Sequence, residues 1–528
     1  MIKMRLIALV LLISGSFGQV FAQITTQEID RLVERAMDTF QVAGVAVGLV
    51  QNGKIIHAKG YGVQSVKTLE PVSEQTQFAI ASNTKAFTTA ALALLVEEGK
   101  ITWTDRVKDH LPEFTMYNNY VTENFNVQDL LTHRSGLGLG AGDLMFIPGG
   151  SDFTIEDILT SFQYFKPVSA FRTQYDYDNL LYMVAGELIA RVSGMSWEAF
   201  INQRILNPLD MDHSFASLED ITDTKDLSEP HREEDGALRT LTHHRERING
   251  AAGGIYATVN DLCQWMLVQL NEGRYGKDLE QHLFSEENQR QMWKIHTTLN
   301  APRSPRFTSH FSGYGLGWNL LDMNGQLLVH HGGFITGMHS FTLLIPELEV
   351  GLVVLTNTDP GGSALHGALV NTVLDKYLKL EEIDWIERTA EGYDQGQSAE
   401  DSVMTRVWER VEAANDAHIS AENYIGMYKD NWFGTVEVAE KEGQLWFTSH
   451  RSPQLNGPMR YYQANTFAIH WEYQDMNADA FAMFYLDENG QAQSIRMKGI
   501  SPNIDFSFDF QDLELKRVEN SASVPEEN

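Results

Sequence analysis

The chain has one cysteine in 528 residues, so no disulfide can form within it. That residue, Cys263, lies in DLCQWML, whose pattern is helical, and we expect a small core residue rather than a nucleophile. Basic residues are scarce as well: 40 Lys and Arg stand against 71 Asp and Glu, a formal net charge of -31. Nucleic acids and anionic membrane surfaces would repel such a chain. We therefore expect no nucleic-acid partner.

Long apolar runs are missing beyond the N-terminus, so we expect no stable membrane insertion. The chain begins MIKMRLIALVLLISGSFGQVFAQ, in which Lys3 and Arg5 precede a short apolar run over residues 6–13. Val20 and Ala22 supply the small residues that precede a cleavage site. This pattern predicts a signal peptide cleaved after Ala22, and hence a secreted or periplasmic protein. The alternative is an anchor that is retained.

Several hydrolase signatures are also missing. The chain has no Gly-x-Ser-x-Gly, no His-Glu-x-x-His and no paired cysteines. These absences argue against a nucleophile elbow and against the usual zinc sites. His330, His331 and His339 could be interpreted as a metal cluster, but no suitably spaced carboxylate accompanies them. We expect no metal and no cofactor.

The hydrophobic pattern predicts an α+β fold. An amphipathic helix over residues 26–40 precedes two β-rich runs joined by Asn52-Gly53, a strong hairpin signal. Strand-like runs return from Leu327 onward, after a long stretch that is mostly helical. This order predicts one antiparallel sheet flanked by helices and split by a large, mostly helical insertion. Alternating short strands after Tyr424 predict a separate small all-β barrel or sandwich.

The stretch FAIASNTKAFTTAA places Ser82 and Lys85 three residues apart, on one face of an otherwise apolar helix. A serine hydroxyl is a weak nucleophile at neutral pH and needs a base. A lysine in a desolvated pocket has a lowered pKa, and its neutral amine can accept the serine proton. The helix N-terminus would favour the negative charge that develops. A Ser-x-x-Lys pair alone is weak evidence, since about one is expected by chance in a chain this long.

A second stretch, FRTQYDYDNLLYMVAGELIARVSG, places Tyr177, Asp178 and Asn179 just before an amphipathic helix. A tyrosine near a lysine ammonium has a lowered pKa and can relay protons. An asparagine amide can hold both a lysine and a substrate carbonyl. Asp178 could attract a substrate amine or simply face solvent.

A third stretch, LLVHHGGFITGMHSF, predicts a strand that runs into a Gly-rich turn. Gly332 and Gly333 would let a substrate approach the strand edge, and His331 could donate to a substrate carboxylate or carbonyl. The alternative is an ordinary polar strand end.

Together, Ser82-Asn83-Thr84-Lys85, Tyr177-Asp178-Asn179 and His331-Gly332-Gly333 resemble the three motifs of the serine beta-lactamase and penicillin-binding-protein superfamily. Their order and spacing resemble the branch of class C beta-lactamases, DD-carboxypeptidases, D-aminopeptidases and related esterases. The stretches DLLTHRSGL, AAGGIYATVNDLCQWM and YGLGW are similar to sequences of the same branch. The C-terminal part resembles the lipocalin-like barrel appended to some of these hydrolases.

The resemblance implies a role for each matching residue. Ser82 would be the acylated nucleophile, Lys85 its activating base and Tyr177 the proton relay to the leaving group. Asn179 would orient both the substrate and Lys85. The oxyanion hole would consist of the backbone N–H groups of Ser82 and Phe334. The substrate-binding residues implied are Asn179, His331, Gly332 and Gly333.

The third motif departs from the class C pattern, in which a lysine stands where this chain has His331. The resemblance therefore implies an exported serine hydrolase that cleaves small amides, esters or peptides, including peptides with D-amino acids. A class C-like beta-lactamase or a DD-carboxypeptidase is the alternative. A non-catalytic binding protein on the same fold is an alternative of another class.

We expect five segments along the chain: a signal peptide (1–22), a beta-lactamase-like domain (24–380), a linker with a helix (381–419), a lipocalin-like barrel (420–518) and a disordered tail (519–528). Residues 391–400 are polar and read as linker, with the helix beginning near Ala399. The barrel is expected either to cover the cleft, to mediate homo-oligomer assembly or to act as a spacer.

Overall fold

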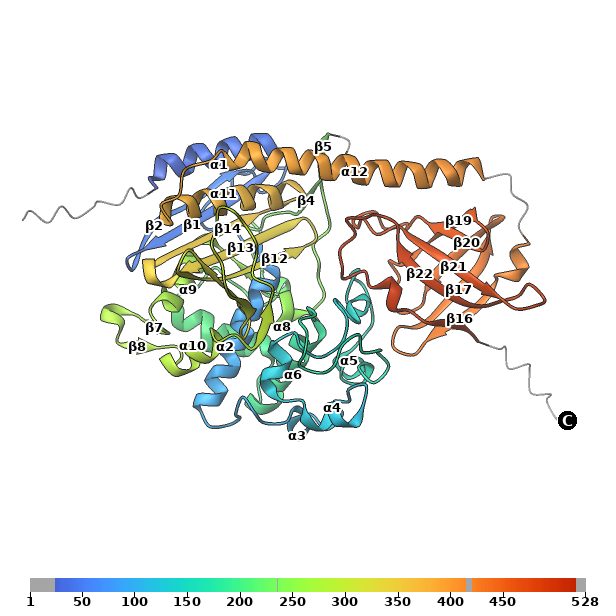
Figure 1. Cartoon of the computed structure of the whole chain (residues 1–528), viewed down its shortest axis with the longest axis horizontal. Coiled ribbons are helices and arrows are strands. Elements are labelled where there is room, and N and C mark those ends of the chain that lie inside the picture. The colour runs from blue at the N-terminus through green and yellow to red at the C-terminus, as the bar shows by residue number, and fades with distance from the viewer. Residues whose placement is uncertain (1–23, 235, 415–419, 519–528) are drawn as a thin grey trace, which may run out of the picture.

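A computed structural model describes residues 24–234, 236–414 and 420–518, which form two lobes joined along one side by a long helix (Figure 1). The larger lobe contains an eight-stranded sheet in the order β2-β1-β14-β13-β12-β11-β10-β9, and each neighbouring pair is antiparallel. The predicted α+β fold class is confirmed. The expected signal peptide and disordered tail lie outside the described residues.

Successive side chains of strand β1 point into two different hydrophobic cores, one on each face of the sheet. Val45, Val47 and Leu49 of β1 belong to one buried cluster, whereas Ala46 and Val50 belong to the other. The period of two directs successive side chains to opposite faces of the sheet, so both faces must be covered. The sheet strands are β1 (Gly44–Gln51), β2 (Lys54–Gly62), β9 (Thr297–Leu299), β10 (Ser312–Tyr314), β11 (Asn319–Met323), β12 (Gln326–Ile335), β13 (Met338–Ile345) and β14 (Val350–Thr356).

Helices α1 (Thr26–Phe40), α11 (Gly361–Tyr377) and α12 (Trp385–Ala413) lie on one face of the sheet (Figure 1). A capping box begins α1: the Thr25 hydroxyl accepts from the Glu28 N–H, and the Glu28 carboxylate accepts from the Thr25 N–H. The apolar stripe of α1 then packs into the same core as β1. The predicted helix at residues 26–40 is confirmed.

The other face carries α9 (Val259–Leu270), beyond which lies the helical insertion with α2 (Thr84–Glu97), α6 (Leu180–Ser193) and α8 (Gly250–Gly253). Cys263 of α9 is fully buried, and its sulfur packs closely against Gly48 of the sheet. A Cβ on Gly48 would lie only 2.6 Å from that sulfur. The expectation of a small core residue is confirmed. The remaining helices are α3 (Val107–His110), α4 (Asn119–Asn124), α5 (Ile155–Ser161), α7 (Trp197–Ile201) and α10 (Glu286–Met292).

The larger lobe also contains three small sheets. In the first, β3 immediately precedes the turn that carries Ser82 and pairs with β6. The small-sheet strands are β3 (Phe78–Ala79), β4 (His231–Glu234), β5 (Ala237–Thr240), β6 (Tyr256–Ala257), β7 (Arg274–Tyr275), β8 (Gln281–His282) and β15 (Thr358–Asp359).

The linker predicted at residues 391–400 is wrong, because α12 runs without interruption through it. Gly392 and Gly396 both lie in helix, although each disfavours helix by about 1 kcal/mol relative to alanine. Packing overrides that local preference: Ile386 of α12 joins the core of α1 and α11, and Val407 and Val411 pack against barrel residues. The helix therefore bridges the two lobes.

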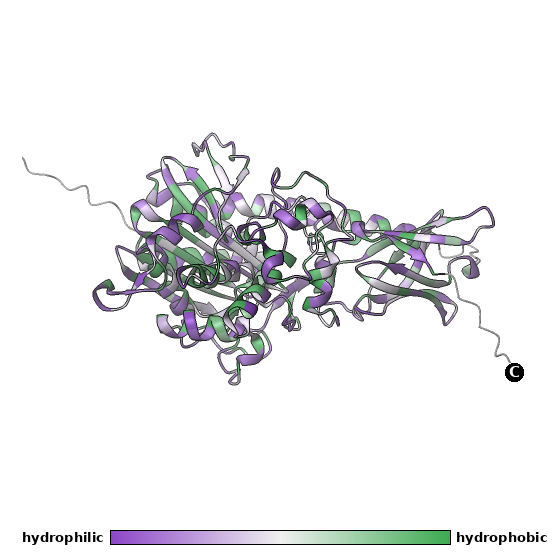
Figure 2. Ribbon diagram, turned by 90° about the horizontal axis from the view of Figure 1, so that it is seen from below, coloured by the Kyte–Doolittle hydropathy of each residue, from purple (hydrophilic) through white to green (hydrophobic). Residues whose placement is uncertain are grey.

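The second lobe is a closed eight-stranded antiparallel barrel, which confirms the predicted all-β domain. Its interior is filled by aromatic side chains: the rings of Tyr424, Phe467 and Phe484 lie 4.9–5.6 Å apart between centroids. Figure 2 shows the barrel at one end of the long axis of the molecule. The strands are β16 (Gly426–Asp430), β17 (Gly434–Lys441), β18 (Gln444–Ser449), β19 (Asn456–Gln463), β20 (Thr466–Ile469), β21 (Ala480–Leu486), β22 (Ala492–Gly499) and β23 (Leu515–Arg517).

The two lobes meet along a seam near α5. The ring of Phe165 lies 5.2 Å from that of Trp432, and Phe153 lies 6.0 Å from Phe433. Arg451 of the barrel forms ion pairs at 2.7 Å with aspartates on either side of the start of α5. Across the described ranges, none of the helices is both long and apolar enough to span a membrane.

Candidate active site

The turn that carries Ser82 is strained. Ala81 has a φ of 44°, in the left-handed region that residues other than glycine seldom adopt. Ser82 follows in a 3-10 turn (Ala81–Asn83) that leads directly into α2, whose first turn contains Lys85. Local strain held by surrounding packing is common at functional sites. The turn presents the hydroxyl at the start of a helix, as the sequence predicts.

Lys85 is fully buried, and its Nζ has three oxygen neighbours. It lies 3.0 Å from the Oγ of Ser82, 2.8 Å from the Oδ1 of Asn179 and 2.9 Å from the carbonyl oxygen of Ala252. Burial lowers the pKa of the Lys85 amine to about 7, although the carboxyls of Asp143 and Asp178 oppose that shift. The amine is therefore neutral in a large fraction of molecules near pH 7.

The three oxygens are not equivalent. The amide oxygen of Asn179 and the carbonyl of Ala252 can only accept, so they take both N–H groups of a neutral amine. The amine lone pair is then left for Ser82, whose hydroxyl can donate. This arrangement orients Lys85 to accept the serine proton.

Tyr177 lies against this pair. The Nζ of Lys85 is 4.8 Å from the centre of the Tyr177 ring. Burial raises the pKa of Tyr177 well above its usual value, and the neighbouring Ser82 side chain offsets only part of that rise. The predicted lowering of this pKa is therefore wrong: desolvation outweighs the nearby amine. The phenol stays protonated and can act as a proton donor.

Asp178 does not face solvent. It is fully buried, and its Oδ1 accepts a hydrogen bond of 3.1 Å from the backbone N–H of Leu181 at the start of α6. The interpretation that Asp178 faces solvent is wrong, and an attraction for a substrate amine stays a prediction. The residue caps a helix, for which a short carboxylate at the N-terminus is well suited.

Strand β12 brings the third motif to the same place. A Cβ on Gly333 would lie 2.3 Å from the carbonyl oxygen of Ile80 and 2.9 Å from the backbone nitrogen of Ser82, so only glycine fits there. Gly332 has open space by comparison, with no neighbour nearer than 3.5 Å. The strand therefore packs directly on the turn of the candidate nucleophile.

The direction of the Phe334 backbone follows from the hairpin. Residues Ile335 and Met338 flank a two-residue turn and form a hydrogen-bonded pair, and such pairs alternate along the ladder. Phe334 therefore directs its N–H away from β13. Strand β11 pairs with β12 only as far as His330, so that edge is open at Phe334. The open N–H beside Ser82 has the placement that an oxyanion hole requires.

His331 is buried among aromatic rings. Its Nε2 lies 2.9 Å from the Tyr314 hydroxyl, and its Nδ1 lies 2.6 Å from the Gly332 carbonyl oxygen, which can only accept. Burial and the nearby Lys85 lower the pKa of His331 to about 3. The ring is thus neutral and donates from Nδ1 to the chain itself. In this conformation it has no free ring N–H for a substrate.

Sequence reasoning missed the residues that support this cluster. The ring of His133 lies tilted against that of Tyr177, at 4.2 Å between centroids, and its Nδ1 accepts from the Asp178 backbone N–H. Asp143 accepts a 2.8 Å hydrogen bond from the side-chain amide of Asn179. The stretches around His133 and Tyr314 resemble family text, but no short motif marks Asp143.

A cavity of about 1030 Å³ opens beside Ser82, a size at the upper end for a small-molecule pocket. Its wall includes Tyr177, Asn179 and His331 from the larger lobe and residues 505–508 from the barrel. Among the described residues, no group of three His, Cys, Asp or Glu could hold a metal ion.

Comparison with known proteins agrees with this geometry. The Beta-lactamase family model matches residues 29–373, which is more than half of the chain, so the chain belongs to the Beta-lactamase family. A second model, a domain of unknown function (DUF3471), matches residues 409–517 and covers the barrel.

Two curated relatives illustrate the range of the family. Unguisins hydrolase ungD' of Aspergillus campestris is 28% identical over 371 residues, covering 68% of this chain and 67% of the relative. Protein flp of Staphylococcus aureus strain N315 is 28% identical over 347 residues, and the match spans 63% of either chain. This chain therefore matches less than two thirds of the length of flp.

A solved structure is similar over both lobes. The octameric penicillin-binding protein homologue from Pyrococcus abyssi superimposes with a TM-score of 0.57 at 21% identity, covering 93% of this chain and 99% of that one. The similarity establishes the fold of both lobes.

Proposed function

We propose that this protein is an exported serine hydrolase that forms an acyl-enzyme on Ser82 and then hydrolyses it. The observation that supports the proposal best is the position of the Lys85 Nζ, 3.0 Å from Ser82 Oγ with two obligate acceptors on its other sides. A neutral amine in that position can take the serine proton as the oxygen attacks a carbonyl.

The remaining groups complete the reaction. The N–H groups of Ser82 and Phe334 would stabilise the oxyanion of the tetrahedral intermediate. Tyr177, which keeps its proton because burial raises its pKa, would protonate the leaving group and be reprotonated by Lys85. Water then attacks the acyl-enzyme, with the same groups acting in reverse.

We propose small amides, esters and short peptides as substrates, including peptides with D-amino acids. The neutral, engaged ring of His331 supports this choice, because it supplies no fixed cation for a beta-lactam or C-terminal carboxylate. A class C-like beta-lactamase or DD-carboxypeptidase is the second candidate, which the family membership favours.

Mass spectrometry after fluorophosphonate treatment tests the acyl-enzyme. We expect one adduct on the peptide that contains Ser82, and none in the Ser82→Ala variant. A correctly folded wild-type protein without an adduct would exclude the proposal and favour a binding protein on the same fold.

Hydrolysis of p-nitrophenyl esters, D- and L-amino-acid amides and nitrocefin tests the substrate class. We expect turnover of esters or amides and little of nitrocefin. The reverse preference would establish the beta-lactamase alternative.

Export and assembly are separate proposals. The signal-peptide pattern supports cleavage after Ala22, which N-terminal sequencing of the mature protein would detect. Homo-oligomerisation through the barrel is proposed because the Pyrococcus homologue is octameric, and light scattering on the purified chain would measure it.

A further inference from the structure

The barrel reaches the active site through the connection between β22 and β23. In this segment the hydroxyl of Ser507 donates a 2.8 Å hydrogen bond to Oδ2 of Asp143 in the larger lobe. Two residues further on, the carboxylate of Asp509 accepts from the backbone N–H groups of Gly142 and Leu144, at 2.7 and 3.0 Å. Barrel side chains therefore hydrogen-bond both to the side chain of Asp143 and to the backbone on either side of it.

A continuous chain of hydrogen bonds leads from Ser507 to the candidate nucleophile. Oδ2 of Asp143 also accepts from the Nδ2 of Asn179 at 2.8 Å. The Oδ1 of Asn179 in turn accepts from Lys85 at 2.8 Å, and Lys85 lies 3.0 Å from Ser82. Because Asp143 Oδ2 accepts from the amide nitrogen, it fixes which end of the Asn179 amide faces Lys85.

Because the residues of this hydrogen-bond series are buried, the series is sensitive to the loss of one partner. Asp143 and Asp509 are fully buried, Asn179 is 6% exposed and Ser507 is 8% exposed. Burial and the neighbouring Asp509 raise the pKa of Asp143, whereas the hydrogen bonds from Asn179 and Ser507 lower it. A buried carboxyl that loses a donor is expected to turn toward other partners, and Asn179 would turn with it.

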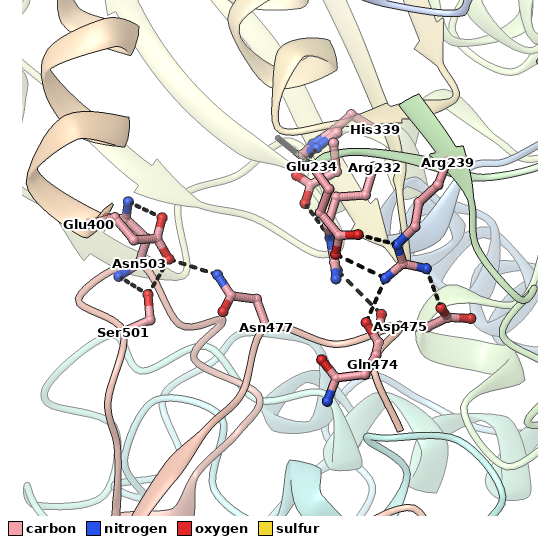
Figure 3. Close-up of polar contacts among 11 residues, drawn as sticks. Arg232, Glu234, Arg239, His339, Glu400, Gln474, Asp475, Asn477, Ser501 and Asn503 are labelled. Atoms are coloured by element: carbon pink, nitrogen blue, oxygen red, sulfur yellow. Dashed lines mark hydrogen bonds and ion pairs between the residues drawn. The ribbon is translucent and has the colours of Figure 1, made fainter. Parts of the chain in front are cut away.

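A second group of contacts holds the barrel segment in place. Glu400 of α12 accepts hydrogen bonds from Ser501, from Asn477 at 2.7 Å and from Asn503 at 2.9 Å, all in the barrel (Figure 3). Nearby, Arg239 of β5 pairs with Asp475 at 2.6 Å. Figure 3 shows two separate groups of contacts, one around Glu400 and one around Arg239.

We propose that Ser507 is a positioning residue of the hydrolase site, supplied by the barrel, and that it aligns Lys85 through Asp143 and Asn179. The inference rests on the proposed acyl-enzyme function. Ser507 touches neither Ser82 nor Lys85 directly. Its role is to hold the amide that directs the lysine lone pair at the serine hydroxyl.

The test is the rate at which a fluorophosphonate labels Ser82 in the full chain, a reaction in which the serine oxygen bonds to phosphorus and fluoride leaves. We expect Ser507→Ala to slow this labelling about 10- to 100-fold, because small misplacements of a base have effects of that size. Ser507→Thr keeps the hydroxyl donor and should restore most of the rate. With a turned-over ester, the loss should fall on kcat rather than on KM.

Ser452→Ala is the matched control. Ser452 is a fully buried barrel serine whose hydroxyl has no hydrogen-bond partner within the described structure, and it does not line the cavity. This variant should label at the wild-type rate. If Ser507→Ala does not fold, Glu400→Ala serves instead. Glu400 lies in the cavity wall, but it makes no hydrogen bond to Ser82, Lys85, Asn179 or Asp143, and its loss loosens the same barrel segment, so we expect a smaller decrease.

The outcomes separate the two proposals. An unlabelled wild-type protein overturns the acyl-enzyme itself. A labelled wild type with equally fast Ser507→Ala labelling, or a Ser507→Thr variant as slow as Ser507→Ala, overturns the positioning role and leaves the hydrolase proposal intact. If folded Glu400→Ala labels at the wild-type rate when Ser507→Ala is unfolded, the positioning role is likewise rejected.

Discussion

The cluster around Lys85 and the seam around Arg451 both gather polar groups around a basic side chain, but only the Lys85 side chain is fully buried. Lys85 is fully buried, with an amide, a carbonyl and a hydroxyl as its neighbours, whereas the Arg451 side chain is 28% exposed and faces two carboxylates. Desolvation lowers the pKa of Lys85 to about 7, and hydrogen bonds with Asp157 raise the pKa of Arg451. Burial among neutral groups thus leaves Lys85 able to act as a base, whereas the carboxylates beside Arg451 keep it charged, so that it holds the two lobes together.

The largest expected effect comes from removing the base. Lys85→Met should slow acylation of Ser82 by about 10⁴-fold or more, since members of a catalytic unit act together. The midpoint of thermal unfolding should change little, because the relief of a buried amine is offset by the Asn179 and Ala252 oxygens that lose their donor. Labelling kinetics and calorimetry measure the two quantities. A fast Lys85→Met variant would contradict the assignment of the base.

At the seam, Phe433→Ala should have the opposite effect: it should lower the stability of the fold and leave the labelling rate nearly unchanged. Phe433 is fully buried between the barrel and Phe153, so its truncation should lower the free energy of unfolding by about 3–5 kcal/mol. The acylation rate per folded molecule should stay within a few-fold of wild type. Urea unfolding and labelling below the midpoint test this pair of outcomes. A large loss of rate in folded protein would contradict the separation of the two regions.

The pH dependence of the labelling rate tests the region around Lys85. The neutral form of Lys85 is the base, so acylation should rise about tenfold per pH unit up to about pH 7 and then level off. At pH 5 the rate should be about 100-fold below the plateau. Stopped-flow labelling from pH 5 to 9 measures the profile. A flat profile would mean that a different group accepts the serine proton.

The smallest effect is expected at Arg451. Arg451→Gln removes ion pairs to Asp152 and Asp157 that are partly exposed, and such pairs contribute about 1 kcal/mol or less. The change in unfolding free energy should shrink further in 0.5 M salt, about the range where screening becomes strong. A loss of several kcal/mol would show that the seam depends on this arginine far more than its exposure suggests.

Much of the fold could be predicted from the sequence because its signals are local. The period of the helix at α1, the Asn52-Gly53 turn between β1 and β2 and the alternating strands of the barrel each depend on neighbouring residues. Ser82 and Lys85 were also within reach, since one helical turn places them on the same face. The polar, glycine-containing middle of α12 misled that reasoning, because packing on both lobes decides its structure.

The sequence by itself determined which chemical groups are present and which of them share a helix or a strand. Only the tertiary structure decided their environment: that burial raises the pKa of Tyr177, that Asp178 caps a helix and that Tyr314 and Gly332 engage His331. It alone brought Ser507 to Asp143, across 364 positions of the chain. The physical reason is that desolvation and hydrogen bonding depend on every group packed around an atom, and most of those groups are distant in sequence.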